Sequence, residues 1–289
     1  MSNSMNETES HPWREKRKEA AAFIQSRTAV SPKVGLILGS GLGSLAGEIT
    51  NATVIPYKEI PHFPKSTVAG HAGEMVIGEL EGKTVIAMNG RFHFYEGYSM
   101  QQLAFPVWVM RTLGVSTLIA TNAAGGINRS FSPGDLMIIV DHINLLWDNP
   151  LIGPNDEELG VRFPSMDLAY PWSLVELAQR AAEKAGVAVK RGVYVATQGP
   201  NYGTRAEGEF LRLLRADAVG MSTVPEIIAA AHAGMQTIGL SCITDASRDP
   251  KAGAAHGVLT HEEVVRVANE TKPRFIRLMK AIIRELPAE

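Results

Sequence analysis

The chain has a single cysteine, Cys242, among its 289 residues. One cysteine excludes an intrachain disulfide and a cysteine-rich zinc site. It is also typical of proteins that work in a reducing compartment, so we expect a cytoplasmic location. Hydrophobic residues make up 45% of the chain and charged residues 20%, the balance of a globular protein with a packed core.

An excess of charge of either sign is also lacking. The 28 Lys and Arg residues nearly balance the 30 Asp and Glu residues, which leaves a formal net charge of -2. Such a chain has no overall field that would attract nucleic acid or anionic lipid. We therefore expect no nucleic-acid partner, and any site for an anion must be built locally.

Long apolar runs are missing as well. No window reaches the roughly 18 uninterrupted apolar residues that a membrane-spanning helix needs, and the N-terminus has no apolar core of signal-peptide length. We therefore predict a protein that is neither secreted nor embedded in a membrane. Residues 1–10 are polar and are predicted to form a disordered tail. No linker, charge block or repeat divides residues 11–289, which are predicted to form one domain.

Short runs rich in Val and Ile alternate along the chain with longer runs of helical period. This alternation is typical of an α/β fold in which helices flank a central β-sheet. The predicted strands lie within residues 33–38, 83–89, 115–122, 135–143, 191–197, 216–221 and 236–244. The predicted helices lie within residues 13–27, 99–113, 172–185, 205–215, 223–234 and 261–285.

The segments that follow the predicted strands are rich in polar residues and glycine. They are "GSGLG" (39–43), "NGRFHFYEGY" (89–98), "TNAAGGIN" (121–128), "QGPNYGTRAE" (198–207), "GMSTVPE" (220–226) and "TDAS" (244–247). Open α/β sheets bind ligands outside the carboxyl ends of their strands. We therefore expect these segments to form the functional site.

Several of these segments offer groups that bind anions. The small residues around Ser40 allow backbone N–H groups to approach an anion, with the hydroxyl as a further donor. A dinucleotide-binding motif is disfavoured because Ser44 stands where its last glycine would be. Arg91 offers a planar fork for phosphate oxygens, His93 can donate to an anion, and Tyr95 can cover a sugar face.

Two more glycine-rich segments complete the predicted anion site. "GHAG" presents His71 between two glycines, and the backbone around Ala123 can add N–H donors. Each of these segments alone could be an ordinary turn. Their occurrence together with Ser40, Arg91 and His93 favours a phosphate site.

The chain resembles the trimeric purine nucleoside phosphorylase family. The resemblance rests on "GSGLG", "GHAG", "GRFHFYEGY", "TNAAGGIN", "DHINL", "GPND", "GPNYGTRAE", "VGMSTVPE" and "HEEV", which occur in the family's order. It implies a nucleoside phosphorylase-like fold and a homotrimeric pentosyltransferase of purine salvage. Such enzymes use inorganic phosphate to cleave purine ribonucleosides or 2'-deoxyribonucleosides into free base and (deoxy)ribose 1-phosphate. Phosphate is a co-substrate, and neither a metal nor an organic cofactor is implied.

The resemblance also implies roles for individual residues. The phosphate would contact Ser40, His71, Arg91, His93, Ala123 and Ser222. The nucleoside would contact Tyr95, Asn122, Ala124, Tyr202, Gly203, Val219, Met221, Asp245 and His261. Among these, the implied catalytic residues are His93, Asp245 and His261. The aromatic residue that covers the nucleoside from the neighbouring subunit would be Trp147, although its loop is shorter here than in the family.

Two residues depart from the family's pattern for 6-oxopurines. Where those relatives place Glu and Asn, this chain has Gly203 and Asp245. A 6-oxopurine would present N1–H to a glycine and O6 to a carboxylate, and an unmade buried hydrogen bond costs roughly 1–3 kcal/mol. Adenine carries no proton on N1, its 6-amino group can donate to Asp245, and its N7 can take a proton from the carboxylic acid form. This chemistry predicts a phosphorylase tuned to adenosine.

Other interpretations stay open. The enzyme would be a 6-oxopurine phosphorylase for inosine, guanosine or xanthosine if Gly203 only served a turn with positive φ and Asp245 only capped the segment that starts at Ala246. Methylthioadenosine phosphorylases also use Asp for the base, but they lack the "GSGLG" turn and have an apolar pocket in place of His261. A nucleoside hydrolase or a non-catalytic nucleoside-binding protein would not need the whole set of anion donors. Arg248 and Asp249 replace the family's small residues and have no assigned role.

Overall fold

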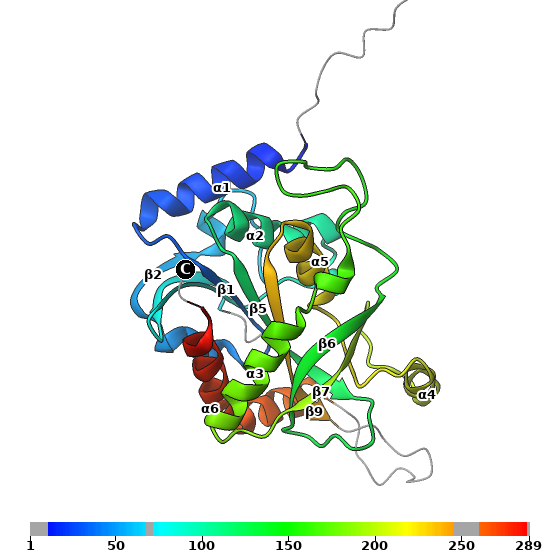
Figure 1. The fold of residues 1–289 in the computed structure, drawn as a ribbon. Coiled ribbons are helices and arrows are strands. Elements are labelled where there is room, and N and C mark those ends of the chain that lie inside the picture. Colours follow the sequence, from blue (N-terminus) through cyan, green and yellow to red (C-terminus); the bar gives the residue numbers. More distant parts are fainter. Residues whose placement is uncertain (1–10, 68–71, 246–259, 288–289) are drawn as a thin grey trace, which may run out of the picture.

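The computed structural model describes residues 11–67, 72–245 and 260–287 (Figure 1). Its strands are β1 (Val34–Leu38), β2 (Thr50–Pro56), β3 (Glu74–Leu80), β4 (Lys83–Asn89), β5 (Thr117–Gly126), β6 (Leu136–Leu145), β7 (Lys190–Thr197), β8 (Ala218–Gly220) and β9 (Gln236–Asp245). They form one nine-stranded sheet in the order β2-β3-β4-β1-β5-β8-β7-β6-β9. Because β9 also pairs with β5, the strands β5, β8, β7, β6 and β9 close into a ring.

The helices lie around this sheet. They are α1 (Arg14–Arg27), α2 (Met100–Thr112), α3 (Trp172–Lys184), α4 (Arg205–Leu213), α5 (Val224–His232) and α6 (His261–Glu285). Helices α1, α2 and α5 pack together, and α3 packs on α6. Figure 1 shows α4 set apart from the other helices, and only Leu211 of this helix is buried.

The prediction of an α/β fold with a central sheet flanked by helices is confirmed. Each predicted helix and strand segment overlaps an observed element of its type, although several strands extend beyond the predicted range. The sheet is mixed: β4, β1, β5 and β9 are parallel neighbours, whereas β3 is antiparallel to β4. The carboxyl ends of the parallel strands therefore meet at one edge of the sheet.

Two strands, β2 and β3, were not predicted. The edge strand β2 is mostly exposed, so it lacks the apolar run that marks the buried strands. Strand β3 has a buried centre, but glutamates and a glycine interrupt its sequence, "EMVIGEL". The turn from β3 to β4 consists of Glu81 and Gly82, both with positive φ, as a two-residue hairpin turn of type I′ requires. The Gly82 in this turn was the local signal for a hairpin.

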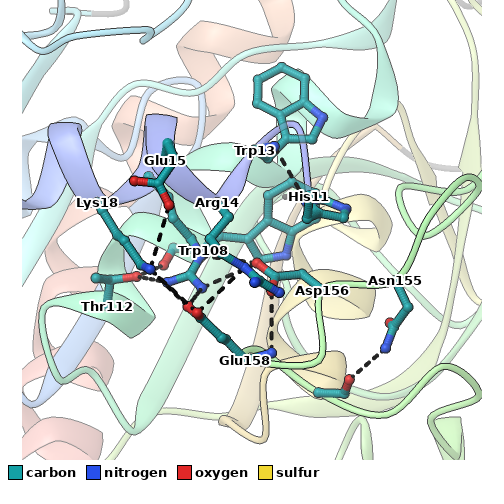
Figure 2. Close-up of polar contacts among 12 residues, drawn as sticks. His11, Trp13, Arg14, Glu15, Lys18, Trp108, Thr112, Asn155, Asp156 and Glu158 are labelled. Carbon is teal, nitrogen blue, oxygen red and sulfur yellow. Dashed lines mark hydrogen bonds and ion pairs between the residues drawn. The ribbon is translucent and has the colours of Figure 1, made fainter. Parts of the chain in front are cut away.

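The N-terminal helix is fixed to the segment that follows β6 by a cluster of charges (Figure 2). The side chain of Asp156 is only 1% exposed, and its two oxygens lie 2.7 Å from Arg14 Nη2 and 3.2 Å from Arg17 Nη2. Burial alone would raise the pKa of Asp156, but hydrogen bonds and charge interactions with the two arginines lower it. His11 extends the contact by donating from Nε2 to the carbonyl of Pro154, 3.0 Å away. These contacts anchor the loop between β6 and α3.

None of the helices in the described ranges is long and apolar enough to cross a lipid bilayer.

Candidate active site

A cavity of about 770 Å³ opens where the parallel strands end. The described residues that were predicted for the site all line it: Ser40, Arg91, His93, Tyr95, Asn122, Ala123, Ala124, Trp147, Tyr202, Gly203, Val219, Met221, Ser222, Asp245 and His261. His71, Arg248 and Asp249 lie outside the described residues. The fold therefore brings residues from distant parts of the sequence around one space.

The inner end of the cavity is built around Arg91, which follows β4 and is 1% exposed. Its Nε donates to Glu226 Oε1 at 2.9 Å. Its Nη1 donates to the carbonyl of Thr121 at 2.5 Å and to Ser222 Oγ at 3.2 Å. The guanidinium is thus held by contacts to the middle of β5, to the turn between β8 and α5, and to the first turn of α5. A buried, oriented cation of this kind suits an anionic ligand.

His93 is oriented by Glu96 through two contacts to the same carboxylate oxygen. Glu96 Oε1 lies 2.8 Å from the backbone nitrogen of His93 and 3.0 Å from its Nδ1. The other oxygen, Oε2, accepts hydrogen bonds from the backbone N–H and the hydroxyl of Thr67. Burial alone would raise the pKa of Glu96, but these hydrogen bonds outweigh it and lower the pKa to about 2.

The ionised carboxylate of Glu96 favours a proton on Nδ1 of His93. The ring of Tyr95 stacks on that of His93, with centroids 4.7 Å apart and planes inclined by 16°. Burial raises the pKa of Tyr95 to about 12, so its hydroxyl keeps its proton at neutral pH. A neutral hydroxyl beside an oriented imidazole can serve as a hydrogen-bond donor to a bound ligand.

A strained turn precedes α5. Thr223 is fully buried and has φ 75° and ψ -48°, a conformation that β-branched residues rarely adopt. The N–H of Val224 donates to the carbonyl of Ser222 at 2.8 Å, which closes a γ-turn of the rare kind. Asn122 Nδ2 holds this turn by donating to Thr223 Oγ1 at 3.0 Å. The turn places Ser222 against Arg91.

The outer end of the cavity holds Asp245, at the end of β9, and Tyr202. A Cβ atom added to Gly125 would lie 3.2 and 3.3 Å from the two carboxylate oxygens of Asp245, so the carboxylate packs against the glycine backbone of β5. Burial, followed by the negative charge of Asp245, raises the pKa of Tyr202. An acidic group and an aromatic ring therefore lie together at this end.

Gly203 adjoins Tyr202, and its backbone does not require a glycine. Its φ angle does not lie in the left-handed region that favours glycine. A Cβ atom at this position would have Glu207 Oε2 as its nearest neighbour, at 3.7 Å. The interpretation that Gly203 serves a turn with positive φ is therefore wrong. A side chain would fit at this position, so glycine leaves the space beside Glu207 open and contributes no side-chain functional group to the cavity. The segment from Ala246, which Asp245 was suggested to cap, lies outside the described residues.

The family model described as the phosphorylase superfamily matches residues 33–284. Purine nucleoside phosphorylase 1 of Geobacillus stearothermophilus is 55% identical over 269 residues, which cover 93% of this chain and 97% of that protein. Purine nucleoside phosphorylase of Bos taurus is 44% identical over 275 residues, 93% of this chain and 94% of that one. The structure of the Schistosoma mansoni enzyme in complex with adenosine has a TM-score of 0.90 and 41% identity, and the match covers 96% and 99% of the two chains.

The chain belongs to the purine nucleoside phosphorylase family. It is therefore an enzyme, a pentosyltransferase with the fold of the nucleoside phosphorylases.

In this purine nucleoside phosphorylase two further predicted residues of the cavity, His261 and Trp147, are exposed. His261 is the first residue of α6, directly after Thr260, whose hydroxyl accepts from the backbone N–H of Glu263 at 3.3 Å. Trp147, predicted to cover a neighbour's nucleoside, lines the cavity of its own chain and is 82% exposed.

Three residues that support the site through a second side chain were not predicted from the sequence: Glu96, Thr223 and Glu226. They lie within the motifs "GRFHFYEGY" and "VGMSTVPE", and these motifs indicated that the three residues are near the site. Each contacts a cavity residue and does not itself line the cavity. Such supporting roles depend on distances that a sequence motif does not contain.

Proposed function

We propose that this purine nucleoside phosphorylase binds inorganic phosphate at the inner end of the cavity and a purine nucleoside at the outer end. The phosphate ligands are Ser40, His71, Arg91, His93, the backbone of Ala123, and Ser222. The buried, anchored guanidinium of Arg91 is the observation that supports this end as the phosphate site. No metal or organic cofactor takes part.

The reaction is a transfer of the ribosyl group. An oxygen of phosphate forms a bond to C1' of the nucleoside while the bond from C1' to N9 breaks, and its electron pair goes to the base. The base gains a proton at N7 as it leaves. Positioned donors around the phosphate, and an acid near N7, stabilise the charges that develop in the transition state. In this arrangement His93 acts on the phosphate and Asp245 on the base.

The nucleoside lies between these two ends. Tyr95 and Met221 contact the ribose, and His261 contacts its 5'-hydroxyl. Tyr202 stacks on the base, whose other contacts are Asn122, Ala124, Gly203, Val219 and Asp245. The position of all these residues on one cavity supports the arrangement.

We propose that adenosine is the preferred nucleoside. Gly203 is the observation that carries this preference, because its backbone leaves space for a side chain and yet it offers no side-chain acceptor for the N1–H of a 6-oxopurine. Asp245 can accept from the 6-amino group and, when protonated, donate to N7. A 6-oxopurine would place O6 against the same carboxylate, which costs free energy when both are buried.

One observation favours a 6-oxopurine as the second candidate. Glu207 Oε2 lies 3.7 Å from the place that a Cβ atom of residue 203 would take, so its carboxylate is the nearest substitute acceptor for N1–H. The same oxygen accepts from the backbone N–H of Thr204 at 2.6 Å, which keeps Glu207 at the start of α4. Inosine and guanosine are therefore the competitors that a substrate screen must include.

The test is the rate of base release from adenosine, inosine, guanosine, xanthosine and methylthioadenosine, each with and without phosphate. We expect release only with phosphate, and the highest kcat/KM for adenosine. Release without phosphate would indicate a hydrolase. A kcat/KM that is higher for inosine or guanosine than for adenosine would favour the second candidate. A kcat/KM that is higher for methylthioadenosine than for adenosine would overturn the role of His261.

We further propose that the enzyme is a cytoplasmic homotrimer in which the segment between β6 and α3 lies at the subunit contact. This segment carries large apolar side chains that are mostly exposed: Trp147 at 82%, Ile152 at 63%, Val161 at 67%, Phe163 at 86% and Leu168 at 70%. Exposed apolar surface of this extent is typical of a protein interface. In the trimer, Trp147 covers the nucleoside site of a neighbouring subunit.

A further inference from the structure

Glu226 is a buried carboxylate that the proposed reaction does not use. It lies in the first turn of α5, is only 4% exposed, and forms a salt bridge of 2.9 Å with Nε of Arg91. We infer that Glu226 is a positioning residue that fixes the orientation of the Arg91 guanidinium for phosphate. This inference rests on the proposed function, in which Arg91 binds phosphate.

The geometry shows why one carboxylate can set this orientation. Glu226 accepts from Nε, while the carbonyl of Thr121 and the hydroxyl of Ser222 accept from Nη1. Acceptors at two different nitrogens define the plane of the guanidinium, because its donors form a rigid fork. Glu226 is the only charged partner among these three acceptors.

The electrostatics of the pair favour positioning over attraction. An isolated guanidinium at 1% exposure would be strongly destabilised, because burial removes its hydration. Glu226 compensates that charge before any ligand binds. The ion pair as a whole is neutral, so it attracts a distant phosphate weakly. The binding of phosphate therefore depends on the direction in which the Arg91 donors point.

The start of α5 explains how Glu226 is held in turn. The γ-turn at Thr223 places Ser222 and Glu226 on either side of the strained residue, and both contact Arg91. A carboxylate in the first turn of a helix is favoured by the partial positive charge of the helix N-terminus. One short segment therefore supplies a proposed phosphate ligand and the residue that orients another ligand.

Two variants of nearly equal volume separate the hydrogen bond from the charge. Glu226→Gln and Glu226→Met both remove the negative charge, but only Gln keeps an acceptor for Nε of Arg91. We expect Glu226→Met to raise the KM for phosphate on the order of 10- to 100-fold. We expect Glu226→Gln to stay close to the parent enzyme, and the KM for the nucleoside to change little in either variant.

Steady-state kinetics with phosphate and nucleoside varied separately give these constants, and thermal unfolding shows whether each variant is folded. The matched control is Glu270→Met, which breaks an exposed ion pair with Arg266 and should leave both KM values unchanged. If Glu226→Met does not fold, Glu226→Asp takes its place: it keeps the charge but shortens the side chain, and the KM for phosphate should again rise.

Equal phosphate KM values in Glu226→Gln and Glu226→Met would overturn the inference, since charge or packing would then account for the effect. An unchanged phosphate KM in a folded Glu226→Met, or in Glu226→Asp, would overturn it as well. Failure of the proposed function looks different, because the parent enzyme itself would release base without any dependence on phosphate.

Discussion

Gly203 and Asp245 lie at the end of the cavity where we propose that the base binds. Both line the same space as Tyr202, and neither offers the hydrogen bonds that a 6-oxopurine needs at N1 and O6. Asp245→Asn removes the proposed acid at N7 and adds an amide donor for O6. A general acid typically accelerates a reaction by about 10²–10⁴-fold. We therefore expect kcat/KM for adenosine to decrease by about this factor and kcat/KM for inosine to increase.

The double variant Gly203→Glu with Asp245→Asn makes the sharper comparison, because it also gives N1–H an acceptor. In the proposed arrangement both residues contact one base and should couple. We therefore expect the ratio of inosine to adenosine kcat/KM to rise by more than the product of the increases in the two single variants. The single Gly203→Glu enzyme is the control. If the effects of the two substitutions on this ratio simply multiply, the two residues do not contact the same base.

Glu96 links the proposed phosphate site to pH. Its pKa is about 2 in the folded protein, below the ordinary value of 4.5. A depressed pKa means that the ionised carboxylate stabilises the folded state above pH 4.5, and that this contribution is lost as the pH falls from 4.5 towards 2. We expect Glu96→Gln to be less stable than the parent at pH 7 and the difference to shrink over this window. Urea unfolding at a series of pH values measures it, and a difference that stays constant with pH would contradict the role.

A sequence motif can identify residues whose own side chains have functional groups suited to a ligand. Arg91, His93 and Asp245 carry functional groups at strand ends, so their type and position in the sequence pointed to a site. Glu96 and Glu226 could not be assigned in the same way. Each acts through a second side chain, and only the observed contacts of 3.0 Å to His93 Nδ1 and 2.9 Å to Arg91 Nε show which one.

Among the strands, β1 shows what makes an element predictable from its own residues. Every residue of β1 is buried, and its sequence "VGLIL" is uniformly apolar or glycine. By contrast, β2 is an edge strand with a mostly exposed surface, so pairing with β3 defines it more than its own residues do. The closure of β5 on β9 also joins strands far apart in the sequence, and no local pattern indicates such a pairing.

The charge cluster between α1 and the loop after β6 is expected to stabilise both elements. Asp156→Ala removes the buried carboxylate partner of Arg17, which is 5% exposed, and leaves Arg17 paired with Glu158, whose side chain is 44% exposed. Breaking a buried ion pair costs about 3–5 kcal/mol, and we expect a loss near 3 because the second partner, Arg14, is partly exposed to water. Denaturant unfolding tests this at pH 7. Glu176→Ala, which removes an exposed pair with Arg180, should cost far less, and an equal loss would contradict the role of burial.

The exposed apolar side chains between β6 and α3 support the proposed subunit contact. Phe163, at 86% exposure, is the most exposed large side chain in this segment, so Phe163→Glu should place a charge within the proposed subunit contact. We expect the parent to have about three times the chain mass of 31.2 kDa by light scattering, and the variant to dissociate and lose activity. Leu213→Glu, on α4 and 83% exposed, is the matched control that should stay trimeric. A monomeric parent with full activity would contradict the trimer. Dissociation without loss of activity would instead remove Trp147 from a neighbour's nucleoside site.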